Sequence, residues 1–239
     1  MSSSFPPSER SRIRRKPGRG SYDEDKIFAI LDAGVVCHVG YAIDGQAYVT
    51  PTAYWRHGHR LFWHGSAASR MIQAQGRGLP VCVTVTHIDG FVVARTGFTT
   101  SLQYRSVMAF GRTALIDDPE AKRSAMHAFI DRLFPGRSGV LRPIRQQELD
   151  AVSLIAMTID EASAKFRADA VLDREEDLSF PCWAGVIPIR TTLGRIVPDP
   201  RLAADLAIPA NLAVYAEGAP LDDVLRMLQR EYANPGRSE

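Results

Sequence analysis

The chain alternates between apolar and polar residues in short runs over residues 35–95, and tight turns separate these runs. Alternation with a period of two, rich in β-branched residues, is typical of half-buried strands. Asp-Gly and His-Gly pairs between the runs favour hairpin turns. The pattern predicts strands over 35–41, 47–55, 60–64, 80–88 and 91–95, with turns at Asp44-Gly45, His57-Gly58 and Asp89-Gly90.

Helical periodicity interrupts the β pattern at a few places. Residues 23–33 place apolar side chains on one face behind an acidic first turn, and Gly34 ends the pattern. Residues 104–116 predict a further strand, whereas 151–166 alternate at first and then allow a helix, so a strand is favoured there with a helix as the alternative. The remaining predicted helices are a short one within 65–72, an amphipathic one over 119–134, and a last one over 221–232.

These elements predict a mainly β protein with peripheral helices. Short strands joined by tight turns favour a closed or nearly closed β-barrel, because closure removes exposed sheet edges. A doubly wound α/β fold needs long helices between its strands, and residues 35–98 contain none. The chain after Phe180 is rich in proline and weakly periodic until the last helix, which is typical of a segment that covers something.

Composition places the chain among ordinary globular proteins. It has 239 residues, of which 45% are hydrophobic and 23% charged, enough to bury a core without disulfides. No apolar run is long enough for a membrane span, and the N-terminus lacks the apolar stretch of a secretory signal. The three cysteines, Cys37, Cys82 and Cys182, are far apart, so the sequence predicts no metal site and a reducing, cytoplasmic compartment.

Positive charge is concentrated at the N-terminus. Residues 1–20 have a net charge of +5, although the whole chain has +2, so the remainder is mildly acidic. We therefore expect neither a nucleic-acid-binding nor a membrane-binding protein. The predicted organisation is a disordered basic arm over 1–12, a main domain over 13–190, and a Pro-rich C-terminal extension over 191–239 that ends in a helix.

The first candidate for chemistry is the segment from His64 to Arg70, where a strand ends in a glycine turn and a helix begins. Free backbone N–H groups at a helix start attract a phosphate, and Arg70 adds a bidentate cation. Ser66 and Ser69 supply hydroxyl groups. The alternative is an ordinary surface helix with Ser66 as its N-cap.

Two further segments combine polar and aromatic side chains. On a strand, Tyr104 and Ser106 point to one face and could complete an anion pocket, although core packing is the alternative. Residues 181–188 place Trp183 between two prolines in a non-periodic loop. Such a loop can lie against a flat ring or can fill a hydrophobic hole.

Taken together, these segments resemble a known family. The strings Val36-Cys37-His38-Val39-Gly40, Leu61-Phe62-Trp63-His64-Gly65-Ser66 and Tyr104-Arg105-Ser106-Val107-Met108-Ala109-Phe110-Gly111 are similar to pyridoxamine 5′-phosphate oxidase-like proteins. Within that family they resemble the flavin-nucleotide-binding branch that includes the 5-nitroimidazole resistance proteins. The resemblance covers roughly residues 14–190. It implies a six-stranded antiparallel split β-barrel that forms a homodimer and binds FMN at the subunit interface.

The resemblance also implies roles for individual residues. Ser69 and Arg70, with Ser106 and Tyr104, would hold the FMN phosphate, and Ser66 would also contact the cofactor. His64 would lie near the pyrimidine edge of the flavin and act as the catalytic residue, where a donor stabilises negative charge on the reduced ring. Trp183 would cover the ring from the partner subunit. The strand that would run beside the ring comprises Val49, Thr50, Pro51 and Thr52.

The function implied is an FMN-dependent oxidoreductase that transfers electrons to a small, flat, electron-poor substrate such as a nitroaromatic or a quinone, with NAD(P)H as a candidate donor. Arg190 and Arg195 do not form the substrate-phosphate signature of the oxidase itself, which argues against pyridoxamine phosphate oxidation. Three alternatives remain open. They are a haem protein with His38, His64 or His87 as axial ligand, a non-catalytic flavin carrier or sensor, and a reductase that uses the deazaflavin F420.

Overall fold

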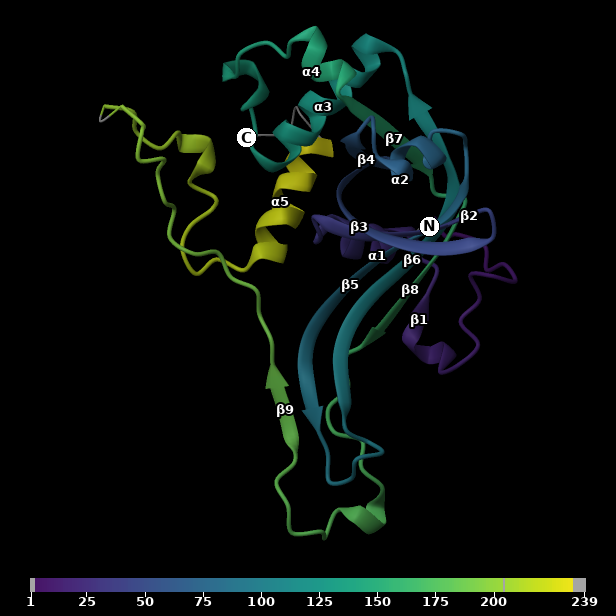
Figure 1. Ribbon diagram of the computed structural model, residues 1–239. Helices are drawn as coiled ribbons and strands as arrows, with labels where there is room; N and C mark the ends of the chain where they lie inside the picture. The colour runs from purple at the N-terminus through teal and green to yellow at the C-terminus, as the bar shows by residue number, and fades with distance from the viewer. Residues whose placement is uncertain (1–2, 204, 234–239) are drawn as a thin grey trace.

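Six antiparallel strands close into a barrel at the centre of the molecule (Figure 1). The structure is a computed structural model that describes residues 3–203 and 205–233. The barrel strands are β2 (Val36–Ile43), β3 (Gln46–His57), β4 (Arg60–Ser66), β5 (Pro80–Val93), β6 (Ser101–Ile116) and β7 (Val152–Thr158). They follow the order β6–β7–β4–β3–β2–β5, and the ring closes because β5 also pairs with β6. The predicted six-stranded antiparallel barrel is confirmed.

Three more strands extend the sheet outside the ring. β8 (Glu161–Arg167) pairs with β6, β1 (Gly20–Ser21) pairs with β8, and β9 (Gly185–Pro188) pairs with the far end of β5. β5 and β6 have 14 and 16 residues, so their ends project below the ring (Figure 1). We call this projection, together with β9, the foot.

The barrel interior is filled by the inward side chains of alternate strand positions. The odd-numbered valines from 81 to 85 on β5 are buried, and they face Val107 and Ala109 of β6 in the ladder. Trp63 is fully buried, and its indole N–H donates to the side-chain oxygen of Gln75 at 2.8 Å. Because that amide oxygen accepts the indole hydrogen bond, a large aromatic side chain is held deep in the core without an unpaired donor.

Helices cover the upper end of the barrel and one side of it (Figure 1). Each predicted helix is present, and α1 and α3 begin at aspartate N-caps, Asp23 and Asp118, whose side chains accept backbone N–H groups. The helix expected within residues 65–72 begins only at Arg70, the sixth residue of that range. The helices are α1 (Glu24–Asp32), α2 (Arg70–Gln75), α3 (Pro119–Leu133), α4 (Gln146–Asp150) and α5 (Leu221–Ala233), with single 3-10 turns η1 (Pro17–Arg19), η2 (Ser138–Val140), η3 (Glu175–Asp177) and η4 (Ala210–Leu212).

A buried arginine fastens α5 to the barrel. Arg132 of α3 donates from Nε to the side-chain oxygen of Gln229 at 2.6 Å and from Nη2 to the carbonyl of Asp32 at 3.2 Å. The carboxylate of Asp32 in turn accepts from Nε of Arg56 at 2.8 Å. These contacts join α1, β3, α3 and α5, so the C-terminal helix is part of the folded core rather than an appended tail.

The expected turn at Asp89-Gly90 is wrong. β5 runs through both residues, and its register against β6 shifts between Ile88 and Gly90. A Cβ atom on Gly90 would lie 2.9 Å from Oε1 of Gln103 and 3.0 Å from the carbonyl oxygen of Ile187. Glycine is therefore used here for the close approach of two neighbouring strands at a bulge.

The segment 151–166 is β structure, as favoured, but it forms two strands rather than one. β7 ends at Thr158 and β8 begins at Glu161. The two residues between them donate their backbone N–H groups elsewhere, Ile159 to the carbonyl of His59 and Asp160 to that of Phe110. Both strands pair with the same edge of β6, with Met157 opposite Thr113 and Glu161 opposite Phe110. The chain thus has one residue more than β6 between these two pairs, and residues 159 and 160 form a bulge.

The N-terminal segment packs against the barrel, so the prediction of a disordered arm is wrong for residues 3–12. Phe5 is 5% exposed and lies edge-on to Phe28 at 6.1 Å between ring centroids. Arg10 donates from Nε to Glu161 at 2.9 Å and lies over the ring of Phe110. Residues 1–2 of the predicted arm lie outside the described residues. Hydrophobic burial and an ion pair with a distant strand fix a segment that looks solvated in sequence.

Candidate functional site

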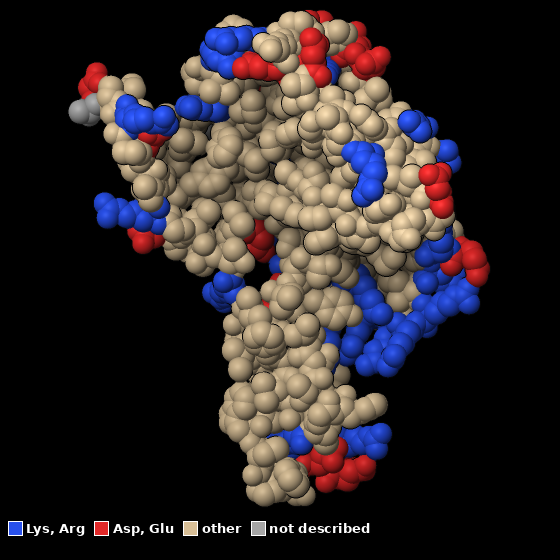
Figure 2. Space-filling view, in the orientation of Figure 1, with Lys and Arg blue, Asp and Glu red and all other residues tan. Residues whose placement is uncertain are grey.

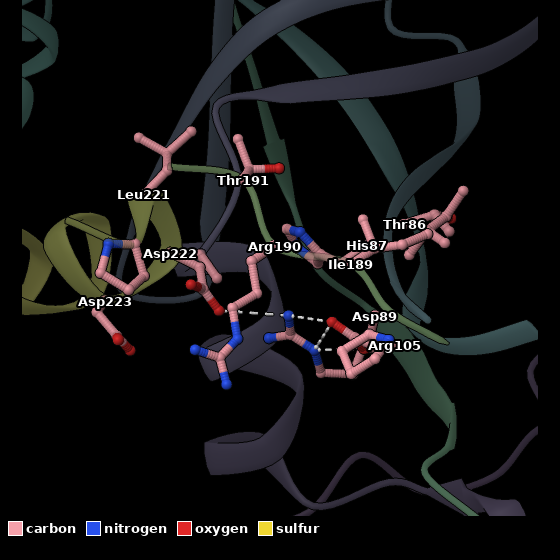
Figure 3. A pocket seen from close by; sticks show the side chains of 14 residues that line it. Thr86, His87, Asp89, Arg105, Ile189, Arg190, Thr191, Leu221, Asp222 and Asp223 are labelled. Carbon is pink, nitrogen blue, oxygen red and sulfur yellow. Dashed lines mark hydrogen bonds and ion pairs between the residues drawn. The ribbon is translucent and has the colours of Figure 1, made fainter. Parts of the chain in front are cut away.

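A pocket of about 760 Å³ opens at the lower end of the barrel, between the foot and α5 (Figure 3). It continues the barrel interior, because the inward positions that carry valine at 85 and 107 are followed by His87 and Arg105, which are partners in the ladder. The core therefore becomes polar where it meets solvent. The lining comprises residues 33, 86–89, 105, 188–191 and 220–223.

An arginine between two carboxylates organises this pocket. Arg105 donates to Asp89 from Nη2 at 2.7 Å and from Nε at 2.9 Å, and it reaches Asp222 of α5 at 3.3 Å (Figure 3). The hydrogen bonds to Asp89 raise the pKa of Arg105 further above its ordinary value. Arg105 is therefore a permanent cation that links the foot to the start of α5.

Two other side chains in the pocket have capacity for a ligand. The Nε2 atom of His87 lies 3.0 Å from the carbonyl oxygen of Ile30, and burial lowers the pKa of His87. The ring is thus neutral at pH 7, donates through Nε2, and keeps Nδ1 as an acceptor. Arg190 points into the same space and forms no ion pair with any described residue. A small polar molecule would find an unpaired cation and an imidazole acceptor here.

The turn before α2 differs from the ordinary capped helix that sequence allowed. Ser69, not Ser66, is the N-cap, and its hydroxyl makes no capping hydrogen bond. Ser66 instead accepts the backbone N–H of Ala68 at 3.3 Å. Arg70 is exposed and lies over the ring of Tyr48 at 4.8 Å. Among the described residues, the first-turn N–H groups and the Ser69 hydroxyl therefore have no partner and could meet an anion beside Arg70.

His64 lies on the outer surface of β4, beneath α3. Its ring is 5.3 Å from that of Phe129 and 6.3 Å from that of Trp55 between centroids. Its Nδ1 atom is buried and has no hydrogen-bond partner among the described residues, and burial lowers the pKa of His64. The ring is therefore neutral at pH 7, so it can donate a hydrogen bond or ligate a metal but does not carry charge.

The strand predicted to run beside a flavin ring alternates between two faces. Val49 and Pro51 point outward, and Val49 is 69% exposed. Thr50 points inward, where its hydroxyl lies 3.2 Å from that of Tyr41, and Thr52 is likewise half-buried. The outer face shared by β2, β3, β5 and β6 also exposes large apolar side chains, namely Val36, Ile88 and Met108.

Within one chain, the residues predicted to bind the FMN phosphate do not lie close together. Tyr104 and Ser106 lie at the lower part of β6, whereas the end of α2 contacts its upper part, where Thr113 donates to the carbonyl of Gln75 at 2.6 Å. Ser106 and Thr113 are seven residues apart, about 23 Å along a strand. Tyr104 and Ser106 can therefore share a ligand with Ser69 and Arg70 only across two chains or through an extended ligand.

Trp183 lies at the tip of the foot, away from the other predicted site residues. It is 66% exposed, and its ring packs over Gly185, where a Cβ atom would come within 2.8 Å of it. The alternative in which this loop fills a hydrophobic hole of its own chain is therefore wrong. The structure leaves the indole free to contact another molecule.

Sequence reasoning missed most of the pocket residues. Asp89 was assigned to a turn, and Asp222 belongs to a helix 117 residues away from Arg105. Of the lining residues, the sequence singles out only His87, as a haem ligand, and Arg190, which does not fit the substrate-phosphate signature. A usable signal was the continuation of the valine alternation of β5 through position 87, which places a histidine on the inward face.

Comparison with known proteins identifies the family. The sequence profile of the pyridoxamine 5′-phosphate oxidase family matches residues 23–166, which include all six strands of the barrel. The chain therefore belongs to the pyridoxamine 5′-phosphate oxidase family, as the sequence strings indicated. No curated protein sequence matches the chain.

Two solved structures are similar over nearly the whole chain. The flavocytochrome Anf3 from Azotobacter vinelandii is 40% identical, with a TM-score of 0.83 over 90% of this chain and 100% of that one. A FAD and haem binding protein from Mycobacterium smegmatis is 33% identical, with a TM-score of 0.79 over 85% of this chain and 98% of that one. A structure described as a 5-nitroimidazole antibiotic resistance protein, from Bacteroides thetaiotaomicron, is 20% identical over 61% of this chain, and its TM-score of 0.46 is too low to place the chain in that branch.

The described residues contain neither a metal-binding cluster nor a membrane-spanning helix. Histidine, cysteine and acidic side chains do not gather anywhere in residues 3–203 and 205–233 into a group that could hold a metal ion by themselves. Within the same residues, no helix is long and apolar enough to cross a membrane. The three cysteines are all free thiols.

Proposed function

We propose that this protein is an oxidoreductase that binds a flavin and a haem. The observation that carries the proposal is the pair of relatives, 40% and 33% identical over 85% or more of this chain, which are described as binding both kinds of group. Haem is therefore proposed as a second bound group in addition to the flavin, rather than as a replacement for it. The name of the second relative favours FAD over the FMN that the sequence resemblance implies.

The flavin fits the outer barrel face together with the start of α2. Val49 and Pro51 offer an apolar strand for a flat ring, and the free N–H groups beside Arg70 offer donors for a phosphate. A bound flavin accepts and releases electrons in pairs or singly. The chain's own part is to hold the phosphate, to cover the ring, and to donate a hydrogen bond from neutral His64 toward it.

We further propose that the protein is a homodimer built on this face. The exposed apolar side chains of β2, β3, β5 and β6 would be buried against a second copy, and the separated residues Arg70 and Ser106 would then meet across the interface. Trp183, exposed on the foot, would reach the partner's flavin. Free cysteines support a reducing compartment such as the cytoplasm.

Of the three histidines considered, His64 is the candidate haem ligand, and this role would replace that of hydrogen-bond donor to the flavin proposed above. A ligand must be a neutral imidazole with a free nitrogen, and the lowered pKa of His64 with its unpartnered Nδ1 meets both conditions. His87 already uses Nε2 on the carbonyl of Ile30. His38 is exposed on the outer face of β2, so it could ligate only at an interface.

The substrate would enter the pocket at the lower barrel mouth. Thr86 and Ile88 of the lining are ladder partners of Ser106 and Tyr104, so the pocket adjoins the proposed flavin face. A small, flat, electron-poor molecule such as a quinone or a nitroaromatic would fit there, with its oxygens toward Arg190. NAD(P)H is the proposed electron donor.

Purification after expression with haem and flavin precursors tests the proposal. The protein should show both flavin and haem absorption, and the mass of the acid-released flavin separates FAD, FMN and deazaflavin F420. Anaerobic reduction by NAD(P)H followed by oxidation with a quinone separates an enzyme from a carrier. Protein that binds neither group when both are supplied refutes the proposed function.

A further inference from the structure

Seven cationic side chains gather on the underside of the barrel, beside the foot. Figure 2 shows Lys and Arg clustered there, below the barrel body. Two segments of the chain supply these side chains: the N-terminal segment before β1, and the end of β8. We call this group the basic cluster: Arg12, Arg14, Arg15, Lys16, Arg19, Lys165 and Arg167.

The basic cluster is held in place by the fold. β1 pairs with β8 so that Gly20 lies opposite Lys165, and Lys165 donates from Nζ to the carbonyl of Arg15 at 3.3 Å. The N-terminal cations are therefore fixed against the same strand that carries the other two. A solvated tail would not bring them to one place.

Few carboxylates neutralise these cations. Glu9 pairs with Arg14, and Asp169 pairs with Arg19 at 2.5 Å and more loosely with Arg167 at 3.9 Å. The cations at 12, 15 and 16 form no ion pair with any residue in the described parts of the chain. The cluster is thus a local excess of positive charge on a protein whose remainder is mildly acidic.

Arg167 is the most buried member of the cluster, and its one ion pair among the described residues is the long contact with Asp169. Its side chain is 7% exposed, and its buried Nε atom has no hydrogen-bond partner among the described residues. The carboxylate of Asp169 lies 3.9 Å from Nε, beyond hydrogen-bond distance. A buried guanidinium with an unpaired donor is unfavourable unless an anion meets it.

Two hydroxyl groups accompany the buried arginine. Tyr104 is the ladder partner of Arg167, and Ser106 is the partner of Lys165, so all four side chains share the outer face. Ser106 donates to the carbonyl of Lys165 at 3.2 Å, which leaves its oxygen oriented along this face. Guanidinium, ammonium and hydroxyl groups on two adjacent strands form a donor set for phosphate oxygens.

We propose that the basic cluster, with Tyr104 and Ser106, binds the diphosphate of a dinucleotide. Within one chain the site lies apart from the start of α2, and its several unneutralised cations suit a ligand with more than one phosphate charge. The phosphate chemistry stands on the cluster alone. The identity of the dinucleotide rests on the proposed function, which supplies two sources: FAD as the bound flavin, or the NAD(P)H donor.

The test compares the affinity of purified protein for inorganic diphosphate in wild type and in Arg167→Met. We expect a loss of tenfold or more, together with a melting temperature at or above wild type, because the substitution removes an unpaired buried donor. Arg201→Gln is the control, since it removes one exposed cation in the distant C-terminal extension. Equal affinity in Arg167→Met and wild type overturns the proposal.

A second variant covers the case in which Arg167→Met folds poorly. The double substitution Arg15→Gln and Lys16→Gln changes two exposed side chains and should leave melting unchanged. It should weaken diphosphate binding severalfold, and the loss should shrink at high salt. Unchanged affinity here also counts against the site. Tighter binding of a single-stranded oligonucleotide than of diphosphate would assign the cluster to nucleic acid and overturn the proposal.

The quantity that Arg167→Met changes, flavin content or the KM for NAD(P)H, distinguishes the two candidate dinucleotides. If FAD is the ligand, Arg167→Met should purify with less flavin while the KM for NAD(P)H stays unchanged. If NAD(P)H is the ligand, flavin content should stay unchanged and that KM should rise tenfold or more. Diphosphate binding without any flavin or haem would refute the proposed function and keep this site, whereas intact flavin and haem with no diphosphate binding would do the reverse.

Discussion

Replacing His64 by leucine separates a functional histidine from a structural one. The ring lies among Trp55 and Phe129 with Nδ1 buried and unpartnered. Such an unpaired polar atom is unfavourable by about 1–3 kcal/mol, so its removal should stabilise the folded protein. A leucine of similar size but different shape packs less well, which offsets part of this stabilisation. We therefore expect the free energy of unfolding of cofactor-free His64→Leu to exceed that of wild type by about 1 kcal/mol at pH 7.

The pH dependence sharpens the expectation. Burial lowers the pKa of His64 in the folded protein, so the unfolded chain binds the proton more readily. Stability that depends on neutral His64 is present above the unfolded pKa of about 6.5 and is lost as the pH falls below it. The advantage of His64→Leu should therefore grow between pH 7 and pH values near 5.5.

Urea denaturation followed by tryptophan fluorescence measures both effects, because Trp55 lies beside the substituted residue. The same variant, expressed with cofactors, should lose haem absorption or shift the flavin midpoint potential to a lower value. A destabilisation of more than 1 kcal/mol at pH 7 would refute the reasoning, since it would mean that His64 has a structural role that its contacts do not reveal.

Three further predictions concern the flavin site, the dimer and the α5 attachment. Arg70→Ala should weaken flavin binding by about tenfold to a hundredfold, because a charge-assisted phosphate contact contributes about 1.5–3 kcal/mol. The melting temperature of cofactor-free protein should not change, because Arg70 is exposed. Titration of flavin fluorescence measures the affinity, and an affinity equal to that of wild type would remove Arg70 from the site. Met108→Asp should convert the dimer into monomers in light scattering, because a charge would be buried at the interface, and a monomeric wild type would refute the dimer itself. Arg132→Met should lower the free energy of unfolding by about 3 kcal/mol, because Gln229 and the carbonyl of Asp32 lose their buried donor. An unchanged free energy of unfolding in calorimetry would show that Arg132 does not fasten α5 to the barrel.

The elements that sequence predicted best are those with strong local signals. The helix over 23–33 has its acidic first turn, its N-cap and a terminating glycine within one segment, and the structure places α1 there. The turn at Asp44-Gly45 is likewise confirmed, with positive φ at both residues and Ile43 opposite Gln46 in the ladder. In these cases the deciding interactions lie within a few residues.

The errors have a common physical cause in contacts between distant segments. Asp89-Gly90 has the composition of a turn, but the nearby Gln103 and Ile187 show that the glycine serves strand approach. The N-terminal arm has the composition of a solvated tail, but Phe5 finds a buried place beside Phe28. Local composition cannot report either neighbour.

The sequence by itself determined the barrel, the family and most element boundaries, because alternating valines, turn pairs and helix caps act through near neighbours and because the family strings are short and contiguous. Only the tertiary structure decided the sites. The pocket forms because Asp89, Arg105 and Asp222 meet around one guanidinium, and the basic cluster forms because β1 carries the N-terminal cations onto β8. Both depend on strand pairing and helix docking over long sequence separations, and side-chain periodicity holds no information about which distant segments will be paired.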